Sequence, residues 1–404
     1  MRKLSFCLLW AYVFSLPWEP FVSISSIGTV TRLSATAAVA VAAIAAVARG
    51  RMRRPGIIVW LLFALTLSNV LTLFWTIAVD ETSSIVLSYV QLFAMVWVVW
   101  EVVRLPREAV LLIFAYCAGA YVSIVDTLLN FATGAASTME GRFAGANLNP
   151  NEFGAILAIG IPFAWFLFLT QRGLYRLAAA AYLPLAMIAI LLTASRGAFL
   201  AGLVAMSVVP LTLSRRSLRS WSVAVVILIV GAGAASTIVP AQLWNRILTA
   251  TDEVSTGTFG GRGVIWAAGL EAFQTRPVLG YGSGAFEPAL STLGINRTEA
   301  PHNVFVAVVV EQGIVGLSLL VALLCASFRL IVGLVPPLRS IWAVAMATWL
   351  VGSMSINWQY GKVTWLLFVL LAVHSAAQSA AVRTTGINPS LSESGSRFEE
   401  RRAS

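Results

Sequence analysis

Charged residues are scarce in this sequence. Only 11% of the 404 residues are charged and 59% are hydrophobic, whereas a soluble domain carries about 25% charged and 45–50% apolar residues. A water-soluble fold of this size cannot bury so much apolar surface. Long apolar runs recur from residue 4 to residue 380, and no polar stretch is long enough to form a soluble domain. The composition therefore excludes a soluble protein and predicts an integral membrane protein.

Reactive residues are also few. The three cysteines lie inside apolar runs without a CxxC pair, there are only two histidines, and neither GxSxG nor a phosphate-binding loop occurs. These absences argue against a disulfide framework, a zinc site, a serine hydrolase and a P-loop enzyme. We therefore expect no metal and no cofactor. The net charge of +10 comes from short basic clusters between apolar runs, a pattern that sets membrane orientation and does not indicate nucleic-acid binding.

The fold class that we predict is an all-α polytopic bundle of about 12 transmembrane spans. A span needs about 20 residues to cross the hydrocarbon core. The first expected span could instead be a signal peptide, but Pro17-Trp18-Glu19-Pro20 is a poor cleavage site. The second, rich in alanine, is the least certain. The expected spans are 4–18, 33–48, 57–78, 83–103, 108–130, 152–170, 175–194, 198–213, 221–239, 313–335, 340–356 and 363–381.

The basic clusters alternate along the chain as the positive-inside rule requires. Most of the 27 basic residues then fall on one side, which we assign to the cytoplasm together with both termini. We expect a transmembrane domain over 1–382 and a disordered cytoplasmic tail over 383–404. The extracytoplasmic loops are expected at about 131–151 and 240–301, and short helices in them would form a small loop domain.

A few arginines oppose this bias and face outward. Arg142 lies in a glycine-containing loop close to Asn149-Pro150-Asn151, where exposed backbone N–H groups could help it to bind an anion. An ordinary turn with one solvated arginine is the alternative, and the spacing does not decide between them.

Arg196 lies within an apolar stretch that is too long for one span. As a helix, residues 177–213 would extend about 55 Å, against a hydrocarbon core of about 30 Å. The chain must turn at Ser195–Gly197, which places Arg196 at the outer mouth of the bundle. Such an arginine either faces an interior cavity or snorkels to the headgroups.

The large loop carries helical periodicity in two places. Leu243, Trp244, Ile247 and Leu248 indicate one short amphipathic helix, and residues 263–274 indicate another. Arg262 opens the second helix after two glycines. The free N–H groups of a helix start and an arginine suit phosphate, although a solvated helix start remains the alternative.

Pro301-His302-Asn303 stands where the large loop re-enters the membrane. Residues 304–335 are again too long for one span, so we expect a break at Glu311-Gln312-Gly313, with His302 and Glu311 both near the outer surface. Histidine suits proton transfer near neutral pH. His374, in the last expected span, is better explained by packing.

Three outward arginines and one histidine suggest an anionic substrate, because arginine forks bind phosphate oxygens in a bidentate manner. We infer a pyrophosphate-bearing substrate with a lipid tail that stays in the membrane. Arginines would stabilise a pyrophosphate leaving group, and the histidine would activate or orient an acceptor hydroxyl.

Several motifs, in this order, resemble the O-antigen ligase and polymerase superfamily. The segment from Arg142 to Asn151 is similar to an upstream arginine and Pro-Asn element of that family. The other motifs are Thr193-Ala194-Ser195-Arg196-Gly197-Ala198, Gly261-Arg262-Gly263-Val264-Ile265-Trp266, Leu279-Gly280-Tyr281-Gly282, Pro301-His302-Asn303 and Glu311-Gln312-Gly313-Ile314-Val315-Gly316.

The resemblance implies a GT-C-like, metal-independent glycosyltransferase of the bacterial inner membrane. Its donor would be a glycan linked to a polyprenyl pyrophosphate, and its acceptor a glycan, a lipid or the cell wall. Arg196 and Arg262 would bind the donor pyrophosphate, Arg142 would assist, and His302 would act near the acceptor. Asn151, Asn303 and Glu311 are further candidates for substrate binding.

Three functions remain open. A ligase moves a finished glycan to an acceptor, whereas a polymerase joins lipid-linked repeat units. Polymerases of this type often carry two large outer loops, and the single large loop here favours the ligase. A small-solute transporter is the third possibility, but the sequence has no clear internal repeat.

Overall fold

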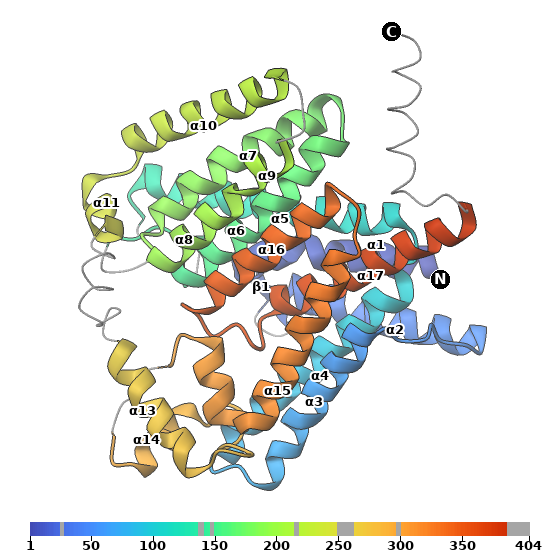
Figure 1. Cartoon of the computed structure of the whole chain (residues 1–404), viewed down its shortest axis with the longest axis vertical. Coiled ribbons are helices and arrows are strands. Elements are labelled where there is room, and N and C mark those ends of the chain that lie inside the picture. The colour runs from blue at the N-terminus through green and yellow to red at the C-terminus, as the bar shows by residue number, and fades with distance from the viewer. Residues whose placement is uncertain are drawn as a thin grey trace.

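The computed structural model describes residues 1–24, 28–135, 141–145, 149–213, 218–248, 262–295 and 300–385 of the chain. This part is almost entirely helical (Figure 1). Its one described sheet is a two-stranded antiparallel pair of β1 (Ser23–Ile24) and β2 (Gly28–Thr29). The expected tail over 383–404 lies largely outside the described residues.

The helices follow one another through the bundle with short connections. The first half contains α1 (Arg2–Ser15), η1 (Leu16–Phe21), α2 (Val30–Arg49), α3 (Ile57–Leu71), η2 (Thr72–Phe74), α4 (Val79–Val102), α5 (Pro106–Thr133), α6 (Pro150–Thr170) and α7 (Gly173–Leu192). The second half contains α8 (Arg196–Met206), α9 (Val208–Leu213), α10 (Leu218–Ile238), α11 (Ala241–Leu248), α13 (Arg262–Thr275), α14 (Phe286–Thr292), α15 (Val304–Val332), α16 (Leu338–Ser353) and α17 (Lys362–Thr385).

A helix occupies each of the expected spans, so the prediction of a polytopic helical membrane protein is confirmed. Nine helical segments of the described chain are long and apolar enough to cross a membrane. The alanine-rich α2, the least certain expectation, is among them. Two expected spans are shorter, because α1 has 14 residues and α16 has 16. At about 1.5 Å per residue, they reach only about 21–24 Å.

The centre of the bundle is α6. Its spanning window is 89% buried, and it packs against α5, α7, α8 and α16. A helix that is apolar on every face belongs in such a position. Because Pro150 and Asn151 form its first turn, the helix fixes Asn151 at one end of the core. Asn149 caps the start of this helix, because its side-chain oxygen accepts a hydrogen bond from the backbone N–H of Asn151 at 2.9 Å.

Both over-long apolar stretches are broken where the length argument predicted. α7 ends at Leu192 and α8 begins at Arg196, and the Ser195 hydroxyl caps α8 by accepting from the backbone N–H of Ala198. Within α15, Gly313 leaves the helical conformation with φ 63° and ψ −157°. A short helix from Val304 therefore precedes the membrane span that follows Gly313.

The side of the bundle that carries the N-terminus gathers basic residues around one buried carboxylate. Glu101, only 1% exposed, pairs with Arg49 at 2.7 Å and with Arg104 at 2.6 Å. The backbone N–H of Arg53 donates to its other oxygen at 2.8 Å. We call this side the arginine-rich side. The contacts join the end of α2, the end of α4 and the segment before α3, so two of the expected basic clusters meet there.

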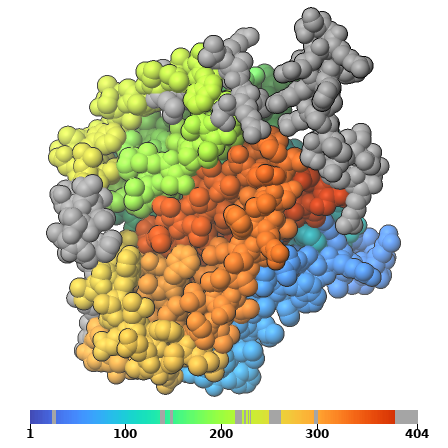
Figure 2. All heavy atoms as spheres, in the orientation of Figure 1, coloured from blue at the N-terminus to red at the C-terminus, as the bar shows by residue number. Residues whose placement is uncertain are grey.

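The opposite side, here called the loop side, carries residues 141–145 and the short helices α11, α13 and α14. In the space-filling view, α13, α14 and the first turns of α15 form one continuous lobe (Figure 2). Buried residues of this lobe include Ile265, Ala272, Phe286 and Val310. The expected small helical loop domain is therefore present. The buried face of α13 consists mainly of small residues, while Leu270 is 50% exposed.

We predict that Glu101→Ala destabilises the bundle by about 2–4 kcal/mol, because removing a buried carboxylate leaves its cationic and N–H partners without an acceptor. Thermal unfolding of the purified protein in detergent measures this change. The matched control is Glu271→Ala, at an exposed position on α13. Equal unfolding temperatures for the two variants would show that the cluster contributes nothing.

Candidate functional site

Arg142 is held inside the loop side and is not solvated. It is 8% exposed. Its Nε donates to the Thr193 carbonyl oxygen at 2.7 Å, and its Nη2 donates to Asn151 Oδ1 at 2.8 Å. The backbone N–H of Phe143 also donates to the Leu192 carbonyl oxygen at 3.0 Å. The loop thus ties the start of α6 to the end of α7, and the solvated alternative for Arg142 is wrong.

Arg196 opens α8 on the same side, three residues after Thr193. It is half-buried, and its Nε donates to the carbonyl oxygen of Arg246 in α11 at 2.9 Å. This contact directs the side chain toward the short helices of the loop side. The turn before it is strained: Ala194 has φ 47°, a conformation that costs a non-glycine residue about 1–2 kcal/mol.

Arg262 lies close enough to Arg196 for their charges to interact. Burial lowers the pKa of Arg262 below its ordinary value, and the positive charge of Arg196 lowers it further. Arginine nevertheless stays protonated in proteins, so two like charges face a common region. Arg262 begins α13, as the sequence predicts; the preceding Gly260 and Gly261 lie outside the described residues.

His302 lies next to α13, because the preceding residue, Pro301, is hydrogen-bonded to that helix. The indole Nε1 of Trp266, one helical turn after Arg262, donates to the Pro301 carbonyl oxygen at 2.8 Å. His302 is half-buried and has φ 46°. Among the described residues, Ala194 and His302 are the only non-glycine positions with positive φ. Strained backbone of this kind tends to occur at functional sites.

Asn303 has a structural contact that sequence reasoning did not anticipate. Its Oδ1 caps α15 by accepting from the backbone N–H groups of Phe305 at 2.9 Å and Val306 at 3.3 Å. The cap fixes the direction in which the chain leaves His302. Asn303 is also 7% exposed, so its structural role is clear, while its expected contact with substrate stays a prediction.

Glu311 lies on the other side of the His302 segment, at the break in α15. It is 4% exposed, and its backbone carbonyl accepts from the N–H of Gly282 at 2.8 Å. The segment 277–284 runs alongside the break: Tyr281 donates to the Val310 carbonyl oxygen at 3.0 Å, and Ile314 to Pro277 at 2.8 Å. Gly280, Gly282 and Gly284 all have positive φ, so this glycine-rich segment is a turn, as expected.

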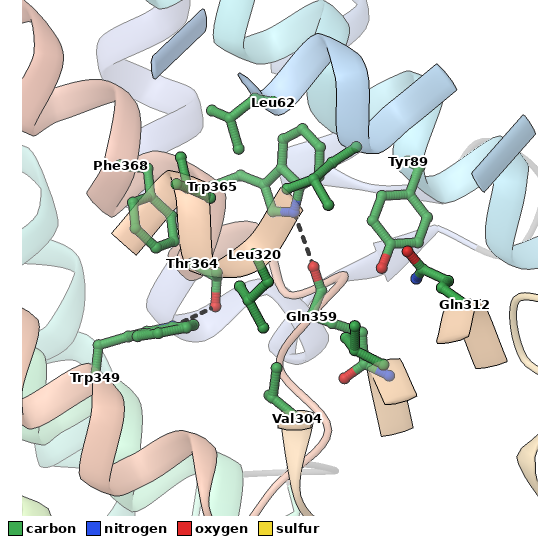
Figure 3. Close-up of a pocket in the computed structure, with 13 residues that line it drawn as sticks. Leu62, Tyr89, Val304, Gln312, Leu320, Trp349, Gln359, Thr364, Trp365 and Phe368 are labelled. Carbon is green, nitrogen blue, oxygen red and sulfur yellow. Dashed lines mark hydrogen bonds between the residues drawn. The ribbon is translucent and has the colours of Figure 1, made fainter. Parts of the chain in front are cut away.

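A buried polar cluster joins this turn to the membrane spans. Asn69 Oδ1, fully buried in α3, accepts from Ser283 Oγ at 2.5 Å and from Gln312 Nε2 at 3.0 Å. Gln312 and Tyr89 line an enclosed pocket of about 30 Å³ together with Gln359 (Figure 3). The loop side is therefore anchored to the bundle core by hydrogen bonds as well as by packing.

The structure brings the predicted residues together in two groups. In the first group, Arg142 contacts Asn151 and Thr193 directly, and Arg196 opens α8 three residues after Thr193. In the second, Asn303 adjoins His302 in the chain, Trp266 of α13 binds the preceding Pro301, and Glu311 lines the same cavity as Pro301. Among the described residues, no three His, Cys, Asp or Glu side chains are placed to hold a metal ion.

Sequence reasoning missed the contribution of the segment between α16 and α17. Asn357, Gln359 and Tyr360 line a cavity of about 900 Å³ on the loop side. The signal was present as a short polar break between two apolar stretches, but its spatial neighbours are far away in the sequence. Asn69 was also missed, although an amide inside an apolar run is a recognisable mark of a buried polar contact.

Comparison with known proteins agrees with this geometry. An O-antigen ligase family model matches residues 179–321, a range that contains Arg196, Arg262, His302 and Glu311. The chain is also 27% identical over 297 residues to the exopolysaccharide production protein ExoQ of Rhizobium meliloti (strain 1021). Residues 179–321 of this chain are therefore similar to the O-antigen ligase family.

The ExoQ match covers 67% of this chain and 64% of ExoQ. The chain thus spans a little under two thirds of the length of this curated relative. Arg142 and Asn151 precede the range of the O-antigen ligase model, yet they contact its residues directly through Thr193.

We predict that Gly282→Ala destabilises the loop side more than Gly294→Ala does. Both glycines have positive φ, which costs an alanine about 1–2 kcal/mol. At Gly294 an added Cβ meets no atom within 4 Å, whereas at Gly282 it lies 2.3 Å from Thr76 Oγ1 and 2.9 Å from Thr76 Cα. Thermal unfolding compares the two variants. Equal shifts would contradict the close packing of this turn.

Proposed function

We propose that this protein transfers a glycan from a polyprenyl-pyrophosphate-linked donor to an acceptor hydroxyl at the loop side. The observation that carries this proposal is that Arg196 opens α8 and contacts α11 on the loop side, where Arg262 opens α13. Two guanidinium groups on the loop side of the bundle suit a pyrophosphate, because each can bind phosphate oxygens with a fork of N–H donors. A lipid tail attached to that pyrophosphate could stay in the bilayer.

The reaction exchanges one bond for another at the anomeric carbon of the donor sugar. The bond from this carbon to the pyrophosphate oxygen breaks, and the bonding electrons leave with the polyprenyl pyrophosphate. The acceptor oxygen forms the new glycosidic bond and loses its proton. Arg196 and Arg262 would stabilise the negative charge that develops on the leaving group. Such electrostatic stabilisation is usually the largest single contribution to catalysis.

Arg142 would act by positioning. It is fixed by Thr193 and Asn151, so it supports the turn that presents Arg196 and adds positive charge beside the donor. His302 would accept the proton of the acceptor hydroxyl or orient that hydroxyl, because neutral imidazole accepts a proton near physiological pH. We propose that this transfer needs no metal ion, since the arginines supply the positive charge.

Two products are compatible with this chemistry. In the ligase reaction, which we favour from the single large loop, a finished glycan moves to a glycan, lipid or wall acceptor. In the polymerase reaction, the acceptor is another lipid-linked repeat unit. The second candidate gains support from the name of ExoQ, a protein of exopolysaccharide production.

The membrane orientation follows from the charge distribution. We propose that the arginine-rich side and both termini face the cytoplasm of a bacterial cell, because positive residues are retained on that side during insertion. The loop side then faces outward from the inner membrane. The donor would enter this site from the outer leaflet.

Arg196→Ala, Arg262→Ala and His302→Ala should each reduce glycan transfer by at least about 100-fold. The first two remove stabilisation of the leaving group, and the third removes proton transfer, which is typically worth about 10²–10⁴-fold. Transfer is measured with lipid-linked glycan extracted from the producing cells. Arg107→Ala, an exposed arginine on the arginine-rich side, is the matched control and should retain activity.

Gene deletion distinguishes the two products. Long glycans accumulating on the lipid indicate a ligase, and single repeat units indicate a polymerase. An unchanged pool of lipid-linked glycan, together with full transfer by all three variants, would overturn the proposed function. Solute flux through the reconstituted protein would then favour a transporter.

A further inference from the structure

The loop side contains a large open cavity that is separate from the arginines. Its volume is about 900 Å³, within the range of about 300–1,000 Å³ usual for ligand sites. It lies between the start of α4, α14, residues 300–301 and the segment joining α16 to α17. Its polar lining includes Glu81, Glu287, Glu311, Asn357, Gln359 and Tyr360.

Two amide oxygens at this cavity have unmet hydrogen-bonding capacity. Asn357 Oδ1 and Gln359 Oε1 are buried, and no described residue donates a hydrogen bond to either. Gln359 as a whole is only 9% exposed. A buried acceptor without a donor costs about 1–3 kcal/mol, so a ligand that supplies donors would gain from binding here.

The remaining polar groups of the cavity are also mainly hydrogen-bond acceptors. Glu81 and Glu287 are acceptors when ionised, whereas burial raises the pKa of Glu311 to about 7, so its carboxyl group can accept or donate a hydrogen bond. Tyr360 is held in its protonated form: burial raises its pKa to about 12, and the negative charges of Glu311, Glu152 and Glu287 contribute to the shift. The cavity therefore presents several acceptors and one phenolic O–H, with a negative potential that disfavours a phosphate or a uronic acid.

The cavity also reaches the predicted reaction centre. Pro301, which precedes His302, forms part of its wall, and the Pro301 carbonyl oxygen binds Trp266 of α13. Arg262 lies one helical turn before Trp266. A ligand in the cavity would thus lie beside the segment that carries His302.

We propose that this cavity binds the acceptor substrate as an uncharged, hydroxyl-rich glycan, with Glu311, Gln359 and Asn357 accepting hydrogen bonds from its hydroxyl groups. The inference rests on the proposed function and specifies the acceptor class for it. The negative charge of the carboxylates that line the cavity would repel an anionic lipid headgroup. Glu311 and Gln359 are positioning and specificity residues in this proposal, since they bind the acceptor away from the bond that forms.

The test measures acceptor and donor dependence separately in the full-length protein reconstituted in nanodiscs. The donor is lipid-linked glycan from the producing cells, and the acceptor probe is a neutral oligosaccharide fraction from partial hydrolysis of their exopolysaccharide. Glu311→Gln and Gln359→Met should raise the acceptor KM about tenfold or more and leave the donor KM within about twofold. Glu271→Gln, an exposed carboxylate outside the cavity, should change neither.

Direct binding gives a second measurement that does not depend on turnover. By microscale thermophoresis, the neutral oligosaccharides should bind the parent protein, and Gln359→Met should weaken binding about tenfold without lowering the thermal midpoint. Alginate oligomers, which are anionic, should not bind. Tighter binding of cationic chitosan oligomers than of the neutral fraction would overturn the assignment to an uncharged glycan.

The two proposals fail in different ways. Unchanged acceptor KM and binding in Glu311→Gln and Gln359→Met, with transfer still lost in Arg262→Ala, would overturn the acceptor cavity alone. Normal transfer in Arg262→Ala would overturn the proposed function. If Glu311→Gln does not fold, Gln359→Met and Asn357→Leu decide the result by the same measurements.

Discussion

The thickness of the bilayer is the constraint on which the loop side depends. Two apolar stretches are too long to cross a hydrocarbon core of about 30 Å as single helices, so each must break. The breaks fall at Thr193–Ser195 and at Gly313. The first presents Arg196 at the mouth of the bundle, and the second separates the short helix after His302 from the membrane span. Both parts of the candidate site therefore lie at helix breaks that the thickness of the bilayer requires.

Breaking a helix exposes backbone groups that must be satisfied, and the chain uses the site residues themselves to do so. The Thr193 carbonyl oxygen accepts from Arg142 Nε, and Asn303 caps the first N–H groups of α15. At the second break, the segment 277–284 donates to the carbonyl oxygens of Val310 and Glu311. Catalytic geometry and local stability are consequently coupled, because the same contacts that satisfy the backbone also fix the candidate side chains.

Much of this arrangement could be predicted from the sequence because it follows from local length and periodicity. The span positions, the turn before Arg196 and the break near Gly313 all depend on counting residues against a fixed thickness. The contact between Arg142 and Asn151 and the proximity of Arg196 to Arg262 agree with the expected convergence of arginines. Their roles toward substrate stay predictions.

What the sequence could not reveal depends on contacts between distant segments. Asn69 and Gln312 are separated by 243 positions and Asn69 and Ser283 by 214, and nothing in the local pattern around any of them indicates their pairing. The cavity likewise combines α4, α14 and the α16–α17 connection. The cap formed by Asn303 has another cause: an asparagine beside His302 is compatible with substrate binding and with helix capping, and the local sequence does not separate the two roles.

The positive and negative side chains of the loop side are unevenly distributed. Glu81, Glu287 and Glu311 line the cavity whose wall includes Pro301, and Arg142, Arg196 and Arg262 are not among its lining residues. In the proposed reaction, a pyrophosphate-linked donor is favoured by the arginines and repelled by the carboxylates, whereas an uncharged acceptor is repelled by neither. Two substrates that are both glycans would then be distinguished by their charge. The acceptor hydroxyl would meet the anomeric carbon near His302, because Pro301 connects the cavity to Trp266, one helical turn after Arg262.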